Sequence, residues 1–229
     1  MKNAQIFAYA CGLGAKHPGC DLGPQALLDA NGMRTISGSP LAADIEYFHC
    51  ADKRNQTDMD NISEVNLRLA KAVNAKLQEQ VFPIVLGGDH SCAVGTWSGV
   101  QNHVGALGLL WFDAHMDSHT PSTSQSGKIH GMPLASLLGY GPNSLTKLLH
   151  GNAKIDPRNV CLMGVRSFEA AEHTLLKKLG VKIIFAADIE QQGIKACLRQ
   201  ALQHINQHSR AFGVSIDLDV LDPSEEPGV

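Results

Sequence analysis

Short apolar runs recur along the chain and alternate with longer segments in which apolar residues are spaced as on one face of a helix. The runs that predict strands are Ile6–Ala10, Ile45–Phe48, Phe82–Leu86, Ala106–Phe112, Val160–Val165, Val181–Phe185 and Phe212–Leu218. The segments that predict helices are Pro24–Ala30, Ile62–Gln80, Ser91–Asn102, Glu169–Leu179 and Gln191–His208. Strands that are apolar on both faces and alternate with helices favour an α/β fold, a three-layer α/β/α sandwich with a mainly parallel central sheet.

The clearest helical pattern lies between Ile62 and Gln80. Apolar side chains at positions 62, 65, 69 and 73 fall on one stripe, as expected when about 3.6 residues make a turn. Asp60 or Asn61 stands just before this stripe, where a side chain can accept the free backbone N–H groups of a first turn. We expect a long amphipathic helix that one of these two residues caps.

Length and composition indicate one soluble domain. The 229 residues, 44 % of them hydrophobic, suffice for one large core or at most two small ones, and no linker or repeat divides residues 1–229. No segment approaches the roughly 20 consecutive apolar residues of a membrane span. A net charge of −3, with 19 Lys and Arg and no basic run, gives no footprint for nucleic acid or an anionic membrane. A small polar molecule is the expected partner.

The six cysteines are predicted to be reduced. They form no C-x-x-C pair, and a chain of this size does not depend on disulfides, so we expect free thiols and a cytoplasmic protein. A bridge between Cys11 and Cys20 is the alternative that their short separation leaves open.

Three of the predicted strands end in histidine and aspartate residues. The run 82–86 leads into G-G-D-H-S, the run 106–112 into D-A-H-M-D, and the run 212–216 into D-L-D-V-L-D-P. The carboxyl ends of parallel strands lie along one edge of a sheet, where ligands usually bind. One cluster of donor side chains is therefore expected there: His90, Asp113, His115, Asp117, Asp217 and Asp219.

This donor set predicts a binuclear metal centre. Two imidazoles and four carboxylates are more ligands than one ion needs, whereas two divalent ions that share bridging carboxylates use all of them. An oxygen-rich set without thiolates favours two Mn²⁺ per chain over Zn²⁺. A single Asp-x-His-x-Asp motif is more often a polar turn, but three motifs at three strand ends favour a metal centre. Two adjacent ions can activate water for hydrolysis, and an imidazole such as His130, in the following loop, suits proton transfer.

These motifs occur in an order that resembles the ureohydrolase family of arginases and agmatinases. The matching segments are Gly-Gly-Asp-His-Ser at 87–91, Asp-Ala-His-x-Asp at 113–117, His-Gly-x-Pro at 130–133 and Ser-x-Asp-x-Asp-x-x-Asp-Pro at 215–223. The resemblance implies a three-layer α/β/α domain whose binuclear manganese site hydrolyses a guanidino compound to urea and an amine. It also implies a homo-oligomer, a trimer or a hexamer.

The resemblance assigns a role to each donor. The first ion would be held by His90, Asp113, Asp117 and Asp217, and the second by Asp113, His115, Asp217 and Asp219. Asp113 and Asp217 would bridge the two ions. Asp117 and His130 would be catalytic, with His130 passing protons to the leaving amine.

Substrate contacts follow from the same likeness, which is closest to arginase. The residues it assigns are His119, Ser124, Ser126, Lys128, Glu169 and Glu172. Ser124 and Ser126 match the arginase loop that holds the carboxylate of arginine, and Glu172 matches an acid that addresses the α-amino group. At positions 119 and 128 arginases usually carry asparagine, and at position 169 aspartate. Lys128 reads a carboxylate by charge where an amide reads it by hydrogen-bond geometry, which leaves agmatinase, guanidinobutyrase and formimidoylglutamase activities as alternatives to arginine hydrolysis.

Two further hypotheses belong to other functional classes. The chain could be a non-catalytic metal-binding or assembly protein that keeps the ligands without positioning a substrate. It could also be a mononuclear zinc hydrolase of amides, because the related deacetylases share this architecture. Chains of the family continue well past the last residue here, so a C-terminally truncated form with impaired activity is expected, in which the last strand leaves an exposed apolar edge.

Overall fold

The computed structural model describes residues 4–16, 18–30, 35–36, 39–40, 45–50, 56–149, 155–222 and 224. One parallel sheet has the strand order β4 (Ile45–His49), β1 (Ala4–Ala10), β5 (Phe82–Gly87), and a second has the order β8 (Lys182–Phe185), β7 (Val160–Val165), β6 (Leu107–Phe112), β9 (Ala211–Ile216). A short antiparallel pair joins β2 (Thr35–Ile36) and β3 (Ser39–Pro40). Every predicted strand is confirmed and the pairing is parallel as predicted, although the hydrogen bonds of the described residues divide the sheet in two.

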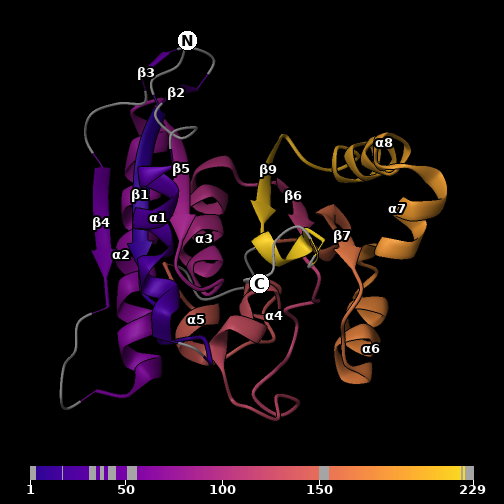
Figure 1. Cartoon of the computed structure of the whole chain (residues 1–229), viewed down its shortest axis with the longest axis horizontal. Coiled ribbons are helices and arrows are strands. Elements are labelled where there is room, and N and C mark those ends of the chain that lie inside the picture. Colours follow the sequence, from indigo (N-terminus) through magenta and orange to yellow (C-terminus); the bar gives the residue numbers. More distant parts are fainter. Residues whose placement is uncertain are drawn as a thin grey trace.

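Helices flank both parallel sheets (Figure 1). In chain order they are α1 (Gly23–Asp29), α2 (Asp58–Gln78), α3 (Cys92–Val104), α4 (Pro133–Leu137), α5 (Asn143–Thr146), α6 (Ala170–Leu179), α7 (Ala186–Gln192) and α8 (Ile194–Ile205). The long helix α2 packs along α3, and α3 contacts both β5 and β6, so this pair of helices serves both sheets. On the other side of the molecule, α8 packs on β6 and β7.

Side chains of β6 show how one strand serves two cores. Leu109 and Trp111 are fully buried in a cluster that contains Trp97 of α3. Leu110, which points to the opposite face of the sheet, is buried in a separate cluster with Ile205 of α8. Because successive strand residues alternate between faces, an unbroken apolar run is what a sheet covered on both sides requires. The predicted α/β/α layering is confirmed.

The start of α2 differs from the prediction. The N-cap is Thr57, whose hydroxyl accepts the backbone N–H of Asp60 at 3.2 Å, while the Asp60 carboxylate accepts the backbone N–H of Thr57 at 3.1 Å. This reciprocal capping box satisfies two backbone donors at once, and it places the first turn before Asp60 rather than after it. The expectation that Asp60 or Asn61 caps the helix was wrong, because Asp60 acts from the third helical position.

The predicted helix 191–208 is also divided. Gly193, with φ of 80°, separates α7 from α8. A backbone with this φ cannot continue a right-handed helix, and glycine adopts it without a Cβ penalty. The short helices α4 and α5 were not predicted, because segments of one turn carry too little apolar periodicity to detect.

Cys11 and Cys50 form a disulfide, with their Cα atoms 5.3 Å apart. The prediction of six reduced cysteines was therefore wrong for this pair, and Cys20, the partner considered for Cys11, belongs to no disulfide. The cause is strand order: β1 pairs with β4 in parallel, with Ala10 opposite His49, so the residues that follow the two strands meet. Because Cys11 and Cys50 are paired, free thiols no longer support the prediction of a reducing compartment.

Reducing the Cys11–Cys50 bridge is expected to lower the free energy of unfolding by about 3–4 kcal/mol, because the bridge joins residues 39 positions apart and limits the unfolded chain. Urea unfolding with and without reductant measures the difference. Cys50→Ser serves as the control and should be as unstable as the reduced protein and insensitive to reductant. Equal stability of the wild type under both conditions would contradict the bridge.

Gly213 of β9 lies against the indole ring of Trp97, and a Cβ at this position would overlap that ring. Gly213→Ala is therefore expected to lower the free energy of unfolding by about 1–3 kcal/mol, because the core can relieve the overlap only by moving Trp97 or the strand. Gly19→Ala is a matched control, since a Cβ there meets nothing within 4 Å and should change stability by less than about 0.5 kcal/mol. Urea unfolding curves of both variants would decide whether α3 and β9 are packed this closely in solution.

The exposed apolar edge expected at the last strand is present in the structure. Among the described residues, β9 pairs with β6 alone, and alternate residues along it are solvent-exposed, with Phe212 at 49 %, Val214 at 43 % and Ile216 at 62 % exposure. Ordinary sheet edges carry charged or short side chains that discourage association. This strand carries large apolar ones instead.

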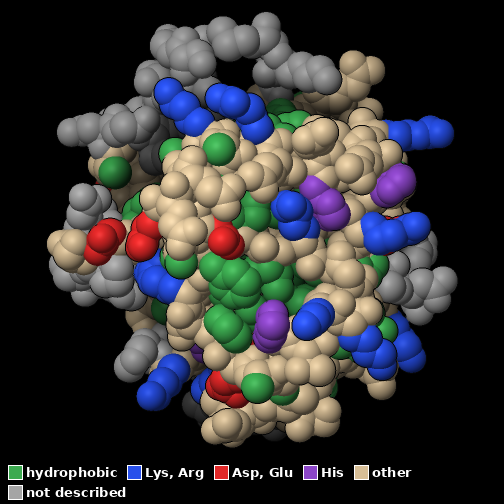
Figure 2. All heavy atoms as spheres, turned by 90° about the vertical axis from the view of Figure 1, so that its right-hand side faces the viewer, with side chains coloured by type: hydrophobic (Ala, Val, Ile, Leu, Met, Phe, Trp, Pro, Cys, Tyr) green, Lys and Arg blue, Asp and Glu red, His purple; other side chains and the backbone are tan. Residues whose placement is uncertain are grey.

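None of the described helices is long and apolar enough to cross a membrane. On the face that α6, α7 and α8 form, Lys and Arg side chains are spread around a hydrophobic area rather than gathered into one patch (Figure 2). This distribution agrees with the absence of a basic run in the sequence.

Candidate metal centre

The six predicted donor residues come together at the carboxyl ends of β5, β6 and β9. Pairing of β6 with β9 sets Phe112 opposite Ile216, so Asp113 and Asp217 leave the sheet side by side. The backbone N–H of Asp217 donates to the carbonyl of Phe112 at 2.8 Å, which fixes this register to the end of the strands. The convergence predicted from the strand ends is confirmed.

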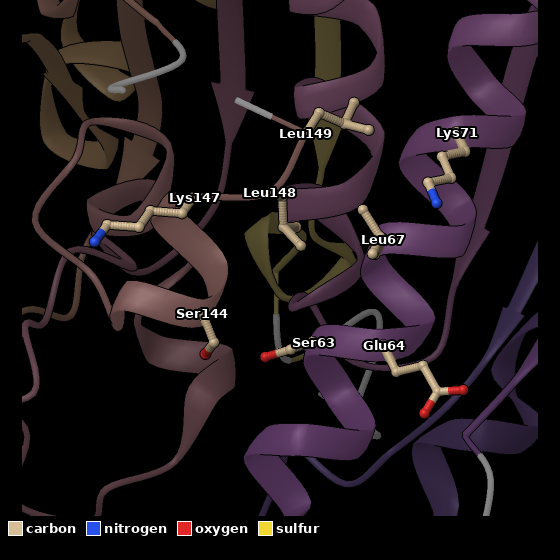
Figure 3. Close-up of a pocket in the computed structure, with 8 residues that line it drawn as sticks. All are labelled: Ser63, Glu64, Leu67, Lys71, Ser144, Lys147, Leu148 and Leu149. Carbon is tan, nitrogen blue, oxygen red and sulfur yellow. The ribbon is translucent and has the colours of Figure 1, made fainter. Parts of the chain in front are cut away.

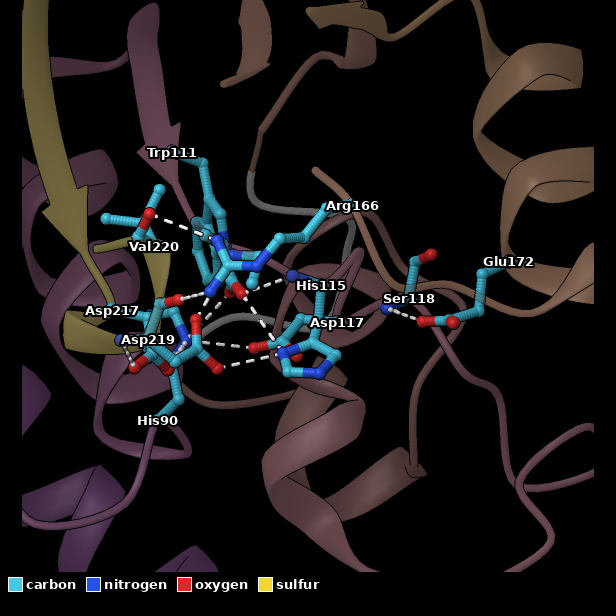
Figure 4. Close-up of polar contacts among 12 residues, drawn as sticks. His90, Trp111, His115, Asp117, Ser118, Arg166, Glu172, Asp217, Asp219 and Val220 are labelled. Carbon is cyan, nitrogen blue, oxygen red and sulfur yellow. Dashed lines mark hydrogen bonds and ion pairs between the residues drawn. The ribbon is translucent and has the colours of Figure 1, made fainter. Parts of the chain in front are cut away.

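His90, in the turn after β5, faces three carboxylates (Figure 4). The distances from its Nδ1 atom are 2.9 Å to Asp117 Oδ2, 3.0 Å to Asp217 Oδ2 and 3.3 Å to Asp113 Oδ2. The other ring nitrogen, Nε2, lies 3.1 Å from the hydroxyl of Ser215 on β9. Ser215 therefore fixes the imidazole plane, and Nδ1 is the atom directed into the cluster.

His115 forms a second group on the other side of Asp113. Its Nδ1 atom is 2.8 Å from Asp219 Oδ2 and 3.6 Å from Asp113 Oδ1. Ligand atoms within 4.8 Å of one another define two sets of three residues, His90–Asp113–Asp217 and Asp113–His115–Asp219. We call these the His90 group and the His115 group. Asp113 belongs to both, as a carboxylate that bridges two ions would.

The donor atoms of this cluster fit a cation better than they fit one another. His90 Nδ1 and Asp117 Oδ2 are buried and 2.9 Å apart, yet neither has a hydrogen-bond partner of acceptable geometry among the described residues. Buried polar atoms without partners are uncommon and costly. Lone pairs that point into one shared space are what metal coordination requires, and imidazole with carboxylate is a ligand set that Mn²⁺ and Zn²⁺ both accept.

Neighbouring groups hold the carboxylate of Asp113 in place. The indole N–H of Trp111 donates to Asp113 Oδ2 at 2.9 Å, and the backbone N–H of His115 donates to Asp113 Oδ1 at 2.7 Å. On the next strand end, Asp219 Oδ1 accepts the backbone N–H of Ala114 at 3.1 Å. Hydrogen bonds of this kind orient metal ligands and are needed for full affinity.

The crowding of carboxylates raises the pKa of both histidines. Burial alone would lower the pKa of His90, but the carboxylates of Asp113 and Asp117 beside it raise that pKa well above its ordinary value. The pKa of His115 rises to about 10 through its contacts with Asp113 and Asp219. The carboxylate cluster therefore favours positive charge between its members. A divalent ion would supply that charge and leave the imidazole nitrogens unprotonated as ligands.

The pKa values of two aspartates in the cluster are shifted in opposite directions. Burial raises the pKa of Asp117 well above its ordinary value, and the nearby Asp113 carboxylate raises it further. Burial opposes ionisation of Asp113 as well, but contacts with His115 and His90 outweigh it and hold the pKa of Asp113 well below its usual range. Asp113 is thus more firmly ionised than Asp117, which suits a bridging ligand.

His130 lies in the turn η3 (Ile129–Gly131), next to the cluster. Its backbone N–H donates to the carbonyl of Gly14 at 3.1 Å. The side chain is solvent-exposed, yet partial burial by the surrounding protein lowers the pKa of the imidazole below its ordinary value. The charges of Asp89 and Asp217 only partly oppose this shift. A largely neutral imidazole in contact with solvent can accept a proton and pass it on.

Asp89 was not assigned a role from the sequence, although it stands inside the G-G-D-H-S motif. It is 5 % exposed, and its carboxylate accepts the backbone N–H groups of Gly14 and Ser91, each at 2.9 Å. A Cβ on Gly14 would lie 2.7 Å from Asp89 Oδ1, so this close approach requires glycine. Asp89 thereby links the turn that carries His90 to Gly14, whose carbonyl accepts the backbone N–H of His130.

The loop predicted to bind the substrate carboxylate is ordered by its own hydroxyl groups. Ser124 Oγ accepts the backbone N–H of Gly127 at 3.0 Å, and Ser126 Oγ accepts that of Lys128 at 3.2 Å. The loop begins beside the centre, since the backbone N–H of His119 donates to the carbonyl of Gly131 at 3.0 Å. Substrate contacts by Ser124, Ser126 and Lys128 stay a prediction.

Glu172, predicted to address an α-amino group, is 5 % exposed and engaged with the backbone. Its two carboxylate oxygens accept the backbone N–H of Ser118 at 3.1 Å (Figure 4) and of Glu169 at 3.0 Å. His119 lies beside this pair of acids, with Nε2 3.4 Å from Glu169 Oε2 and 3.5 Å from Glu172 Oε2. The three residues form one acidic corner, in which Glu169 is the exposed acid.

A separate cavity of about 480 Å³ lies between α2 and the α5 segment (Figure 3). Ser63 and Ser144 face each other across it, and Lys71 and Lys147 stand on its two walls. It shares no lining residue with the metal centre. The predicted chemistry therefore lies at the sheet edge and not in this cavity.

Comparison with known proteins gives one consistent match. The sequence model of the arginase family matches residues 2–229. The arginase of Bacillus caldovelox is 36 % identical over 238 residues, covering 100 % of this chain and 80 % of the relative, and that of Bacillus subtilis is 37 % identical over 237 residues, covering 100 % and 79 %.

Solved structures agree with the sequence matches. The crystal structure of the Bacillus subtilis arginase aligns with a TM-score of 0.90 at 35 % identity, over 100 % of this chain and 78 % of that one. The formimidoylglutamase of Bacillus subtilis aligns with a TM-score of 0.78 at 21 % identity, over 100 % of this chain and 68 % of that one, a likeness that shows the shared fold alone.

Proposed function

The chain belongs to the arginase family and is a hydrolase that acts on guanidino groups, and from this membership and the geometry of its metal centre we propose that it hydrolyses arginine to ornithine and urea with two bound manganese ions. One observation carries the proposal. The His90 group and the His115 group meet at the shared carboxylate of Asp113, as two adjacent ions require.

We assign one ion to His90, Asp113, Asp117 and Asp217, and the other to Asp113, His115, Asp217 and Asp219. Bound there, the two ions would supply a water molecule activated for attack on the guanidino carbon. The oxygen-rich donors support manganese over zinc. The unpartnered lone pairs of His90 Nδ1 and Asp117 Oδ2 support occupancy of the first position.

The residues of the chain have separate tasks in the proposed reaction. His130 takes up a proton at its imidazole and delivers it to the departing amine, a task that its lowered pKa and its contact with solvent support. Asp89, through Gly14, keeps the backbone of His130 at a fixed position relative to His90.

Selection of arginine is proposed to rest on both ends of the amino acid. Ser124, Ser126 and Lys128 would bind the carboxylate, with Lys128 adding charge attraction. The α-amino group would lie at the acidic corner that His119, Glu169 and Glu172 form. Glu169 is the exposed member, whereas Glu172 is buried and orders the Ser118 backbone.

A urea-release assay tests the proposed function. The metal-free chain is loaded with Mn²⁺ and offered arginine, agmatine or guanidinobutyrate at equal concentration, with urea measured, and formiminoglutamate in parallel, with formamide measured. Urea together with ornithine from arginine is the expected result, with slower or no release from the others. Preferential turnover of agmatine would contradict the carboxylate contacts, and preferential turnover of guanidinobutyrate would contradict the amino contacts, but either result would leave guanidino hydrolysis standing.

Metal content separates the remaining hypotheses. Two bound Mn²⁺ per chain with a metal-dependent rise in the unfolding temperature, but without turnover of any guanidino compound, would support a non-catalytic metal-binding protein. One ion per chain would contradict the binuclear centre and favour a mononuclear hydrolase. Plasma emission spectrometry on desalted protein gives this number directly.

A further inference from the structure

Arg166 follows β7 directly, and its side chain reaches a segment that follows β9, a strand that is not next to β7. In the sheet, β6 lies between β7 and β9, so the side chain of Arg166 crosses the end of β6 to the turn η5 (Leu218–Val220) after β9. Its guanidinium group donates to the carbonyl oxygen of Val220 at 3.1 Å, of Leu221 at 3.0 Å and of Asp219 (Figure 4). Three consecutive carbonyls are thus held by one side chain.

The backbone of Arg166 binds the segment after β6, which carries other residues of the same site. Its N–H donates to the carbonyl of Ala114 at 2.9 Å, and the N–H of Ser167 donates to the same oxygen at 2.9 Å. Ala114 stands between Asp113 and His115, and its own N–H donates to Asp219 Oδ1 at 3.1 Å. Arg166 therefore links the segment after β6 to the segment after β9.

These two segments carry all three members of the His115 group. Three ligands assigned to the other ion, Asp113, Asp117 and Asp217, also lie on these segments, but among the described contacts Arg166 bonds to none of them and bonds directly to Asp219 of the His115 group. His90 comes from the turn after β5, which Arg166 does not reach among these contacts. We propose that Arg166 is a positioning residue for the metal site of the His115 group and not for that of the His90 group. This inference rests on the proposed metal-dependent function of the site.

The chemistry of arginine explains why this residue type occupies the position. The guanidinium group is planar and presents its N–H donors as a fork, so it can satisfy several carbonyls in a fixed geometry. A lysine ammonium is a single nitrogen on a flexible stem and cannot span three carbonyl oxygens in this way. The position of Asp219 should therefore depend on the guanidinium shape and not on positive charge alone.

Calorimetric titration of the metal-free chain with Mn²⁺ tests the inference. The wild type is expected to bind two ions, whereas Arg166→Lys and Arg166→Met should keep one and bind the other about 10- to 100-fold more weakly, the usual loss when a group that orients metal ligands is removed. Arg158→Met is the matched control, because the guanidinium of Arg158 pairs with Asp156 in its own turn and touches no donor. It should bind both ions like the wild type.

A double-variant series identifies which ion is affected. His90→Ala should leave the ion of the His115 group, and adding Arg166→Met should then weaken the remaining binding. His115→Ala should leave the ion of the His90 group, and adding Arg166→Met should change nothing further. A residue that only stabilises the fold would weaken binding equally in both backgrounds, which makes this difference the decisive measurement.

Each outcome either supports or overturns the role of Arg166. Full binding of two ions by both Arg166 variants, or equal weakening in both backgrounds, would overturn the role of Arg166 while leaving the proposed function untouched. Failure of the wild type to bind Mn²⁺ would overturn the proposed function and this inference together. If Arg166→Met does not fold by circular dichroism, Arg166→Lys carries the test, because it keeps the aliphatic stem and the charge.

Discussion

Asp113→Ala is expected to lose both metal ions and to reduce urea production by at least about 10⁴-fold, which would be the largest effect of any single substitution in this chain. Asp113 is the one residue common to the His90 group and the His115 group, with its two oxygens directed to different histidines. Without it, both groups lose a ligand, and the carboxylate that they share in the structure is missing. The activation of water by metal, worth several kcal/mol of the barrier, is then lost.

Asp219→Ala is the matched variant, because Asp219 belongs to the His115 group alone. It should lower the metal content from two ions to about one, whereas Asp113→Ala should lower it to none. Asp113→Asn keeps the size of the buried side chain and guards against a loss that comes only from unfolding. Equal metal content in the Asp113 and Asp219 variants would contradict a bridging role for Asp113.

Asp217→Ala distinguishes the family pattern from the contacts observed. The resemblance to arginases makes Asp217 a second bridge, which predicts loss of both ions. In the structure, Asp217 groups with His90 and Asp113 only, which predicts loss of one. Metal counts on this variant show whether Asp217 moves toward the second position when ions bind.

Much of the fold could be predicted from local patterns. The strands were found because a buried parallel strand is apolar on both faces, as Leu109, Leu110 and Trp111 show in β6. Features that depend on which strands become neighbours were not predicted. The bridge between Cys11 and Cys50 exists because β1 pairs with β4, and a separation of 39 residues gives no local sign of it.

The candidate site likewise contains features that could be predicted from local patterns and features that could not. Six donors could be predicted because residues at the ends of parallel strands meet at one edge, a rule that needs only strand positions. Trp111 was missed as a partner of Asp113, although the two are two residues apart and a buried indole N–H needs an acceptor. Arg166 and Asp89 could not be predicted, because their partners lie 53–55 and 75 positions away and become neighbours only in the folded chain.

His130→Ala is expected to bind both ions normally and to lower kcat by about 10²- to 10⁴-fold, the range for loss of a general acid or base. The backbone N–H of residue 130, which donates to Gly14, is retained in the variant, so the turn that carries it should keep its place. None of the described hydrogen bonds and ion pairs joins the side chain of His130 to a predicted metal ligand. Metal content and turnover, measured on the same sample, separate proton transfer from metal binding.

Added imidazole provides the readout that a structural role would not give. If His130 moves protons between solvent and the leaving amine, free imidazole should restore part of the lost kcat in His130→Ala and leave the wild type unchanged. His103→Ala, a histidine on the last turn of α3, is a control that should lose no activity. Unchanged kcat in His130→Ala, or a loss that follows metal content and resists imidazole, would remove His130 from the proton path and return that task to solvent.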